Sequence, residues 1–416
     1  MSGTHEHSVA FVRTTEIPQQ PAPSNAAGPI KWMRDNLFAT WPNALLTVAS
    51  IYVIFLVLSS TMPWILGGIW DAPSLTACRE ILQGESAACF AVLSDRWHQL
   101  LFGFKYPSEY YWRPTLALFL MFFALAPVLF FDLPRKLLIF TALFPFIAYW
   151  LIWGGTIWIP IFAMVGFIAG YFVYARFVAQ NFALGFFGGV AGAAIVWYIS
   201  SFVVAAIAPE TPLLGAVPSR DLGGFMLNLM LGLTCVSLSI PLGIALALGR
   251  QSSMPLIKWI CVIFIEFIRG VPLITLLFVA SVMLAYFFPP DATVDLFLRV
   301  VIMITIFSAA YIAEVIRGGL AALPKGQYEA ADALGMNYWQ TTRFITLPQA
   351  LKISIPGIMN TFIGLYKDTT LVVVIGLLDP LGIGRAALAD TKWNGLSTET
   401  YLFVALFFFV SCFKLV

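Results

Sequence analysis

The sequence predicts an all-α, polytopic membrane protein with about ten transmembrane helices. Of its 416 residues, 60% are hydrophobic and only 11% are charged, whereas a soluble domain has about 25% charged residues. Apolar runs long enough to cross a bilayer, which takes about 20 helical residues, recur along the whole chain. These runs lack the alternating pattern of barrel strands, so helices must satisfy their backbone hydrogen bonds. A soluble globular fold is therefore excluded.

The same composition excludes several functional classes. A net charge of +2 leaves no basic surface for nucleic acid. Five Cys and three His are too few and too scattered for a metal cluster. The histidines, at positions 5, 7 and 98, fall in a tail and a loop, so a polytopic enzyme would lack its polar catalytic set at the bilayer. No catalytic and no metal-binding residues are predicted.

Residues 1–42 are predicted to be a disordered cytoplasmic tail, because residues 1–30 mix Pro, Gln, Ser and charge without an apolar period. The first apolar run is too long and too far from Met1 for a signal peptide, so it is expected to remain as a span. The turn Gly154-Gly155 separates two runs, and one broken helix is the alternative there. The ten predicted spans are residues 43–66, 114–131, 137–154, 156–174, 182–207, 223–249, 268–289, 297–317, 355–377 and 400–416.

Lys and Arg are more frequent in the connecting segments that lie on the same side as the two termini than in those on the other side. Because cytoplasmic loops are enriched in Lys and Arg, both termini are predicted to be cytoplasmic. The long loop 67–113 is then periplasmic. Its cysteines Cys78 and Cys89 are disulfide candidates, because that compartment is oxidising and the loop between them is short. Two free thiols are the alternative. The other three cysteines lie within or beside apolar runs and are expected to be core residues.

The loop of residues 318–352 joins the eighth and ninth spans and is patterned as two short helices. Pro324 suits a first helical position, and Gly335 suits the left-handed end of a helix. Asn337 can cap a second helix, which Pro348 would interrupt. The pattern therefore predicts a helix, a bend and another helix.

One side of the first of these helices is slim and partly apolar. Tyr328, Ala331 and Leu334 recur at helical spacing and are expected to share a face, beside the small Ala330. Such a helix can enter a groove on another protein. The alternative is an amphipathic helix on the lipid headgroups, and loop length and composition do not decide between the two.

The same loop carries a motif that resembles the EAA loop of bacterial ABC-importer permeases. The matching residues are Glu329-Ala330-Ala331, Gly335, Ile345 and Leu347-Pro348. Neighbouring strings resemble one branch of that family, the polar amino acid permeases, and most strongly the larger permease of the general L-amino acid transport system. These strings are residues 266–273 (EFIRGVPL), 313–319 (AEVIRGG), 324–327 (PKGQ) and 367–371 (KDTTL).

The resemblance is dense in residues 222–416 and implies a C-terminal five-helix type I ABC-importer permease core with the EAA coupling loop 318–352. Residues 43–221 are then an N-terminal membrane extension of about five spans, in which residues 156–215 look like additions to the family pattern. The chain ends inside or just after its last span, where relatives add a short basic tail. Whether the C-terminus is complete stays open.

The resemblance implies a bacterial inner-membrane location, surrounded by lipid. The implied partners are a second permease subunit, two ATPase subunits and a periplasmic amino acid-binding protein. No lysine follows a glycine, so the chain lacks a GxxxxGK[ST] phosphate loop. ATP and Mg are therefore expected on the partner ATPase, with no cofactor and no enzymatic activity in this chain. The implied ATPase-coupling residues are Tyr328, Glu329, Ala330, Ala331, Leu334, Gly335, Ile345, Leu347 and Pro348.

Charges inside apolar spans mark the candidate substrate path, because a charge near the bilayer centre costs about 2.5–3.5 kcal/mol on insertion scales. Lys367 and Asp368 lie in the ninth span and are followed by Thr369 and Thr370. Adjacent helical residues point roughly 100° apart, so the charged pair can receive the carboxylate and the ammonium of an amino acid from two directions. A structural pair, tied to neighbouring helices or to the subunit interface, is the alternative.

Arg269 and Glu314 are secondary substrate candidates. Glu266 lies three residues before Arg269, and Glu314 lies three residues before Arg317, so both are expected to form same-face pairs. Both pairs lie near cytoplasmic helix ends, where snorkelling to the headgroups is the alternative role.

The sequence thus predicts the permease subunit of an ATP-driven amino acid importer, which forms the translocation path and couples it to an ATPase. A secondary transporter driven by an ion gradient is the main alternative. Many secondary transporters consist of two repeated halves with broken helices. No internal repeat is found in this sequence.

Overall fold

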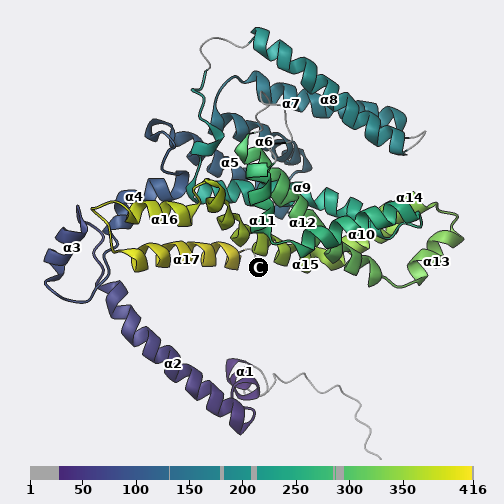
Figure 1. The fold of residues 1–416 in the computed structure, drawn as a ribbon. Helices are drawn as coiled ribbons and strands as arrows, with labels where there is room; N and C mark the ends of the chain where they lie inside the picture. Colours follow the sequence, from purple (N-terminus) through teal and green to yellow (C-terminus); the bar gives the residue numbers. More distant parts are fainter. Residues whose placement is uncertain are drawn as a thin grey trace, which may run out of the picture. The chain divides into compact units, whose positions relative to one another are not determined.

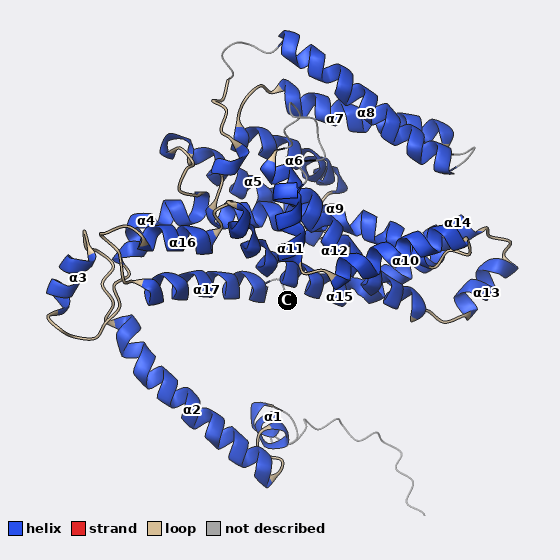
Figure 2. Ribbon diagram, viewed as in Figure 1, coloured by secondary structure: helices blue, strands red, loops and turns tan. Residues whose placement is uncertain are grey.

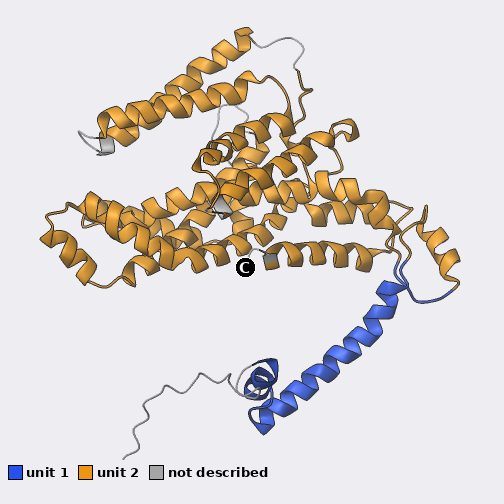
Figure 3. Ribbon diagram, turned by 180° about the vertical axis from the view of Figure 1, so that it is seen from behind, with its two compact units in different colours: residues 1–68, 84–88 blue, residues 69–83, 89–416 orange. Residues whose placement is uncertain are grey.

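The structure is a computed structural model, and it describes residues 28–130, 132–178, 182–207, 213–283, 286 and 295–414. The regular secondary structure of these residues is helical (Figures 1 and 2). The chain divides into two compact units, which are coloured separately in Figure 3. The first unit comprises residues 1–68 and 84–88, and the second comprises residues 69–83 and 89–416.

The first unit contains a short helix, α1 (Pro29–Asn36), and a long helix, α2 (Trp41–Leu66). The Thr40 hydroxyl accepts a hydrogen bond from the Asn43 amide and so caps the start of α2. The 26 residues of α2 are enough to cross a bilayer. Helix α1 falls within the predicted disordered tail and was not expected, whereas residues 1–27 lie outside the described residues.

The second unit holds the remaining elements. Its N-terminal part contains α3 (Leu75–Leu82), α4 (Ala91–Phe102), η1 (Ser108–Tyr110), α5 (Trp112–Leu129), η2 (Arg135–Leu137), α6 (Leu138–Trp153), α7 (Trp158–Phe177), α8 (Phe182–Ile207) and η3 (Ser219–Asp221). Its C-terminal part contains α9 (Gly224–Arg250), α10 (Pro255–Gly270), α11 (Leu273–Phe278), η4 (Val279–Met283), α12 (Leu296–Ala321), α13 (Gly326–Ala333), α14 (Tyr338–Thr341), η6 (Thr342–Thr346), α15 (Leu347–Asp368), η7 (Thr369–Ile375), α16 (Pro380–Leu388) and α17 (Ser397–Lys414).

Seven helices of the described residues are long and apolar enough to cross a membrane, and an eighth span results if α10 is counted together with the segment that follows it. Helices α5 and α17, with 18 residues each, occupy the two remaining predicted spans. The prediction of an all-α polytopic membrane protein is therefore confirmed.

The seventh predicted span, residues 268–289, begins at the wrong place. A separate helix, α10, occupies residues 255–270, and the chain then bends by 100° into the segment Leu273–Met283. Pro272 causes the bend, because proline lacks a backbone donor and forces the preceding Val271 into an extended conformation. The described part of this span is thus a broken pair of helices.

Glycines permit close packing of the helical hairpin α7–α8. A Cβ atom added at Gly170 would lie 2.8 Å from the carbonyl oxygen of Gly189, and one added at Gly189 would lie 2.9 Å from that of Gly170. Because lipid tails are as apolar as leucine, the hydrophobic effect does not drive membrane helices together, and close packing contacts of this kind hold them instead. At the start of the hairpin, Gly154 and Gly155 have positive φ angles and separate α6 from α7, so the prediction of two helices there is confirmed.

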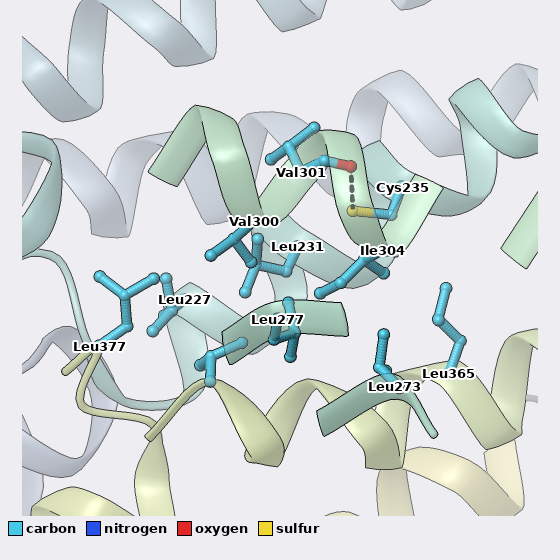
Figure 4. Packing of buried hydrophobic residues seen from close by; sticks show 11 residues of the cluster. Leu227, Leu231, Cys235, Leu273, Leu277, Val300, Val301, Ile304, Leu365 and Leu377 are labelled. Carbon is cyan, nitrogen blue, oxygen red and sulfur yellow. Dashed lines mark hydrogen bonds between the residues drawn. The ribbon is translucent and has the colours of Figure 1, made fainter. Parts of the chain in front are cut away.

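The C-terminal part of the second unit has a buried core between α9, α11, α12 and the end of α15. Leu231, Leu277 and Ile304 are at most 1% exposed in this core (Figure 4). The Cys235 thiol donates to the Val301 carbonyl oxygen, with 3.7 Å between the two atoms, and so joins α9 to α12. Cys235 therefore acts as a small core residue, as its apolar surroundings in the sequence indicate.

Residues 69–83 and 89–113 are called the disulfide segment here. Cys78 and Cys89 form a disulfide in the structure, and both side chains are buried. The Cys89 amide also donates to the buried carboxylate of Glu399 at 3.3 Å. The disulfide segment is thus joined to the start of α17.

Two further polar contacts join the disulfide segment to the connection between α16 and α17. The Arg96 guanidinium pairs with the Asp390 carboxylate, and the Trp393 indole N–H donates to the Asp95 carboxylate at 2.9 Å. Trp393 is 1% exposed, so this hydrogen bond satisfies a buried donor. Helix α4 also packs against α9 and α16. One segment therefore contacts the ends of several C-terminal helices.

Asp379 lies between η7 and α16, outside the membrane spans. Its carboxylate accepts hydrogen bonds from the Leu381 and Gly382 amides, at 3.2 and 2.8 Å, and so caps α16. The side chain is completely buried. Burial raises the pKa of Asp379 to about 6, although the two amides and the Arg385 guanidinium act in the opposite direction.

Candidate functional site

The first helix of the loop 318–352, α13, has a left-handed end. Gly335 has a φ angle of +69°. The Gly335 amide donates to the Asp332 carbonyl at 2.9 Å, and the Met336 amide donates to the Ala331 carbonyl at 3.1 Å. These two hydrogen bonds form a Schellman motif, which satisfies carbonyl groups at the end of a helix. The bend after α13 is therefore built from backbone geometry that favours glycine.

The side chains of α13 do not all lie on the single face that was expected. Leu334 is 77% exposed and Tyr328 is 38% exposed, but Ala331 is completely buried. Helix α13 packs against the following segment η6 of the same chain, so one side of α13 is turned inward. The implied coupling residues that stay exposed to a partner are Tyr328, Glu329, Ala330, Leu334, Gly335 and Pro348.

The second helix of the loop continues into the membrane span. Asn337 and Gln340 form a reciprocal capping box, with hydrogen bonds of 2.9 and 3.0 Å. Contrary to expectation, Pro348 does not interrupt the helix, which runs from Tyr338 to Ile375. The π-helical segment η6 comes directly before α15, and its wider turn accommodates the proline ring and its missing donor. Ile345 and Leu347 are half-buried in this stretch, and Pro348 is exposed.

Two glutamines connect the loop helix to the span that follows it. The Gln349 amide donates to Gln327 Oε1 and to the Ile345 carbonyl, both at 2.9 Å. Gln327 lies in the first turn of α13, and Gln349 lies in the first turn of α15. This hydrogen bond therefore joins the start of α13 to the start of α15, the helix that carries Lys367 and Asp368.

Lys367 and Asp368 lie where α15 changes into the 3₁₀ helix η7. Lys367 is exposed and Asp368 is half-buried, and neither takes part in an ion pair with another residue that the structure describes. Thr369 is completely buried, and its hydroxyl donates to the Tyr366 carbonyl at 2.7 Å. The Thr370 hydroxyl donates to the Lys367 carbonyl at 2.8 Å. The two charged groups are thus accessible, whereas Thr369 faces the interior of the chain.

Glu314 is the centre of an ion cluster that joins α9, α10 and α12. Its carboxylate pairs with Arg317 of the same helix, with Arg250 at 3.2 Å and with Arg269 at 3.9 Å. Arg250 also pairs with Glu266 at 2.8 Å. The expected pair between Glu314 and Arg317 is confirmed. The expected pair between Glu266 and Arg269 is wrong, because the end of α9 brings Arg250 to Glu266 and Arg269 turns to Glu314.

The charged pair of α15 and the ion cluster lie at different levels of the membrane spans. A Cβ atom at Gly357 would lie 2.6 Å from the Val315 side chain, so α15 meets α12 there, next to Glu314. Asp368 lies further along α15 by about 16 Å, at 1.5 Å per residue. The candidate substrate residues therefore form two separate charged sites, and one free amino acid cannot contact both at once.

Two features of the site have no clear signal in the sequence. Arg250 ends a predicted span, where the positive-inside pattern alone accounts for a cation, and only the fold brings it to Glu266 and Glu314. Tyr338 and Phe344 are 57% and 64% exposed beside the coupling motif. Their aromatic character suits a protein contact, but the sequence does not say which side chains of the second helix face outward.

Together, the helical spans, the structured loop linked to one of them and the exposed charges within that span define a membrane transport subunit. Residues 239–416 match the family model described as binding-protein-dependent transport system inner membrane component. The glutamate/glutamine/aspartate/asparagine transport system permease protein BztC of Rhodobacter capsulatus is 51% identical over 98% of this chain and 95% of its own length. The inner membrane amino-acid ABC transporter permease protein YhdY of Escherichia coli is 36% identical over 96% of this chain and 93% of its own length. A chain of an amino acid ABC transporter crystallised with histidines is 32% identical over 46% of this chain and 86% of its own, with a TM-score of 0.41.

The chain therefore belongs to the amino acid ABC transporter permeases, which are inner membrane components of binding-protein-dependent transport systems. It is a multi-pass protein of the inner membrane and a transport permease, and it works with an ATPase and other components of an ABC importer. The resemblance carried by the EAA loop and its neighbouring strings is confirmed. The family model begins inside α9, whereas the two relatives also cover the N-terminal part of the chain.

Proposed function

We propose that this permease imports amino acids and that Lys367 and Asp368 contact the amino acid during its passage. One observation carries the proposal. Two opposite charges are adjacent within a membrane span, both are at least partly exposed, and neither takes part in an ion pair with a third described residue. The names of two relatives, which specify amino acid transport, support the same substrate class.

A zwitterion that leaves water needs compensating charge near both of its ends. Coulomb interactions are several-fold stronger at the low effective dielectric of such a site than in water. The Lys367 ammonium suits the carboxylate of an amino acid, and the Asp368 carboxylate suits its ammonium. The end of α15 adds a change of helix geometry at this point, and irregular backbone within a membrane is tolerated mainly where it is buried in protein or lines a cavity.

The ion cluster around Glu314 is a second binding site for the same substrate. Its three arginines outnumber its two glutamates, so the cluster retains a positive charge that attracts a carboxylate. Arg269 and Glu314 are the contacts proposed here, and Arg250 holds Glu314 in place. A substrate would pass from one charged site to the other along α15.

Coupling to ATP hydrolysis is assigned to α13 in a groove of a partner ATPase. Tyr328 and Leu334 offer exposed apolar contacts, and the Gln327 to Gln349 hydrogen bond passes their movement to α15. ATP and Mg are assigned to that ATPase, and this chain carries no cofactor in the proposal. Ile345 and Leu347 support the helix that follows the bend.

The proposed assembly contains a second permease subunit, two ATPase subunits and a periplasmic amino acid-binding protein. Both termini are placed in the cytoplasm, and the loop 67–113 is placed in the periplasm. The contacts of Cys89, Arg96 and Asp95 with residues 390–399 support a folded segment on that side.

Uptake by the complex in lipid vesicles tests the proposal. Asp368→Asn keeps the size of the side chain and removes its charge, and Lys367→Met does the same for the ammonium. Each variant is expected to lower amino acid uptake at least tenfold, while subunit stoichiometry and basal ATP hydrolysis stay unchanged. Ile355→Ala, at an exposed apolar position of the same helix, is the matched control and should transport normally.

The outcomes separate the alternatives. Loss of a subunit from both charge variants would assign the pair to a structural role. Normal uptake by both variants would place the path elsewhere. Uptake by this chain alone, driven by an ion gradient without an ATPase, would replace the proposed mechanism with secondary transport.

A further inference from the structure

Asn228, in the second turn of α9, is a buried amide without a partner. It is completely buried, and neither its nitrogen nor its oxygen has a hydrogen-bond partner among the residues that the structure describes. Burial of an unpaired amide is costly, because its hydrogen bonds to water are lost without replacement. An unpaired group of this kind in a native core needs a functional explanation.

The side chain of Asn228 points into the apolar core. Asn228 and Cys235 are seven residues apart, so they share one face of α9 to within about 20°. On that face, Leu231 and Cys235 belong to the buried cluster between α9, α12 and the end of α15 (Figure 4). The Cys235 thiol already bonds to α12. This core therefore offers few polar groups that could hold a water at Asn228, which would need two to four of them.

The 3₁₀ helix η7 passes beside α9 at the level of Asn228. One turn after Asn228, a Cβ atom at Gly232 would lie 3.2 Å from the Tyr366 ring. One turn before it, the Gly224 amide donates to the Leu378 carbonyl at 2.8 Å. Because η7 joins Tyr366 to Leu378 and packs against α9, it covers the core where Asn228 lies.

The geometry of η7 is typical of an element that moves. It runs for seven residues, whereas 3₁₀ helices longer than three or four residues are uncommon, and such a stretch often marks a hinge. It ends at Gly376, which has a φ angle of +93° and open space around an added Cβ. By contrast, α9 and α12 are in close contact, since a Cβ atom at Gly243 would lie 2.7 Å from the Ile312 side chain. Movement of η7 away from Asn228 therefore costs less than movement of α12.

Asn228 lies nearer to the outer end of the span than the charged pair of α15. The Gly223 amide donates to the Phe102 carbonyl at 3.0 Å, so the start of α9 adjoins the disulfide segment, which is placed in the periplasm. The charged pair follows Tyr366, which packs one helical turn deeper along α9. A solute from the periplasm would thus pass η7 and Asn228 before it reaches the charged pair.

We propose that η7 is an outer gate that moves away from α9 during transport, and that Asn228 then lines the path and hydrogen-bonds the polar solute and its water. The inference rests on the proposed function, in which the path runs past Lys367 and Asp368. A neutral amide suits this role, because it can both donate and accept and carries no charge that would hold the solute back. While the gate is closed, the unpaired amide raises the free energy of the closed state and so favours opening.

Thiol labelling during transport tests the movement of η7. The complete complex with Asn228→Cys is placed in vesicles with its periplasmic side outward and ATP inside, and loaded binding protein and a charged thiol reagent are added outside. Labelling at position 228, mapped by mass spectrometry, is expected to be at least tenfold faster with ATP than without it. Cys235 is the control in the same chain, because it lies on the same buried face but is bonded to α12. It should not react in either condition.

Asn228→Leu tests the contact with the solute. Leucine has a similar size but forms no hydrogen bond, so uptake is expected to fall about tenfold. The Tm of the complex without ATP should stay the same or rise, because an unpaired amide has been removed from the core. Ser239→Ala is the matched control, since Ser239 is also completely buried on α9 but its hydroxyl donates to the Val236 carbonyl at 2.9 Å. This control should transport normally.

The results that overturn the inference are distinct from those that overturn the proposed function. Labelling at position 228 that ATP does not accelerate, in a complex that transports, removes the gate, and equal labelling of Cys235 assigns the reaction to a general loosening of the core. Normal uptake by Asn228→Leu removes the contact with the solute, and a lower Tm together with lost uptake assigns Asn228 to a structural role. Normal uptake by the Lys367 and Asp368 variants, with ATP-dependent labelling still present, removes the charged pair from the path but leaves the movement of η7.

Discussion

Replacement of Gly335 by valine tests the coupling role of the loop directly. The φ angle of +69° lies in the left-handed region, where an L-residue costs about 1–2 kcal/mol and a β-branched residue lies at the upper end. No atom lies within 4 Å of a Cβ at this position, so the cost comes from the backbone and not from a clash. About 2 kcal/mol corresponds to a change of about 30-fold in an equilibrium constant. The Schellman end of α13 should therefore open in the Gly335→Val variant.

The expected result is a lower number of amino acids imported per ATP hydrolysed, with the ATPase still attached and the permease still inserted. The effect should grow in the order Gly335→Asn, Gly335→Ala, Gly335→Val, because asparagine tolerates this conformation best. Gly326→Ala is the matched control, since Gly326 lies in the same helix, has no positive φ and also has open space around it. Wild-type coupling in Gly335→Val, with the ATPase attached, would refute the reasoning.

Three further predictions concern other parts of the molecule. Cys78 and Cys89 should resist thiol reagents in intact cells until a reductant is added, and labelling of both without reductant would contradict the disulfide. Burial raises the pKa of Asp379 to about 6 from 3.8, so the stability that its protonated form contributes, about 3 kcal/mol, is full below about pH 4 and is lost as the pH rises through about 6. Asp379→Asn should abolish the resulting difference in Tm between pH 5 and 7.5. A difference in Tm that this variant leaves undiminished would come from another titrating group. Gly170→Ala should lower Tm, because the added methyl group overpacks the α7–α8 contact at a cost of about 1–3 kcal/mol. Gly188→Ala is the control and should not lower Tm, since the nearest atom to its added Cβ lies at an ordinary 3.5 Å. Equal losses of Tm in the two variants would rule out the close contact between Gly170 and Gly189 as the cause.

Features set by short stretches of sequence could be predicted. The left-handed Gly335 and the cap at Asn337 depend on residues within one or two turns, so their pattern was sufficient. The spans could be located because the bilayer demands long apolar helices. Pro272 also carried a local signal, but the apolar run across it concealed that two helices meet there at 100°.

Features set by distant parts of the chain could not be predicted. The pairing of Arg250 with Glu266 depends on how α10 crosses the end of α9, and no sequence spacing encodes that crossing. The inward position of Ala331 depends on how α13 packs on other parts of the chain, which include η6. The separation of Asp368 from Glu314 follows from the contact between Gly357 and Val315, which only the assembled helices define.

The disulfide segment has a consequence for biosynthesis. Its contacts join residues that lie 294, 298 and 310 positions apart in the chain. At about 5–20 residues per second, translation reaches the partner residues about 15–60 s after Arg96, Asp95 and Cys89 have been made. During that interval the segment lacks its C-terminal partners, although Arg96 can already pair with Asp95 and the disulfide can already close. Completion of the fold therefore waits for insertion of the final helix, and a chain that stops before Glu399 would leave a recognisable unpaired surface for quality-control proteases.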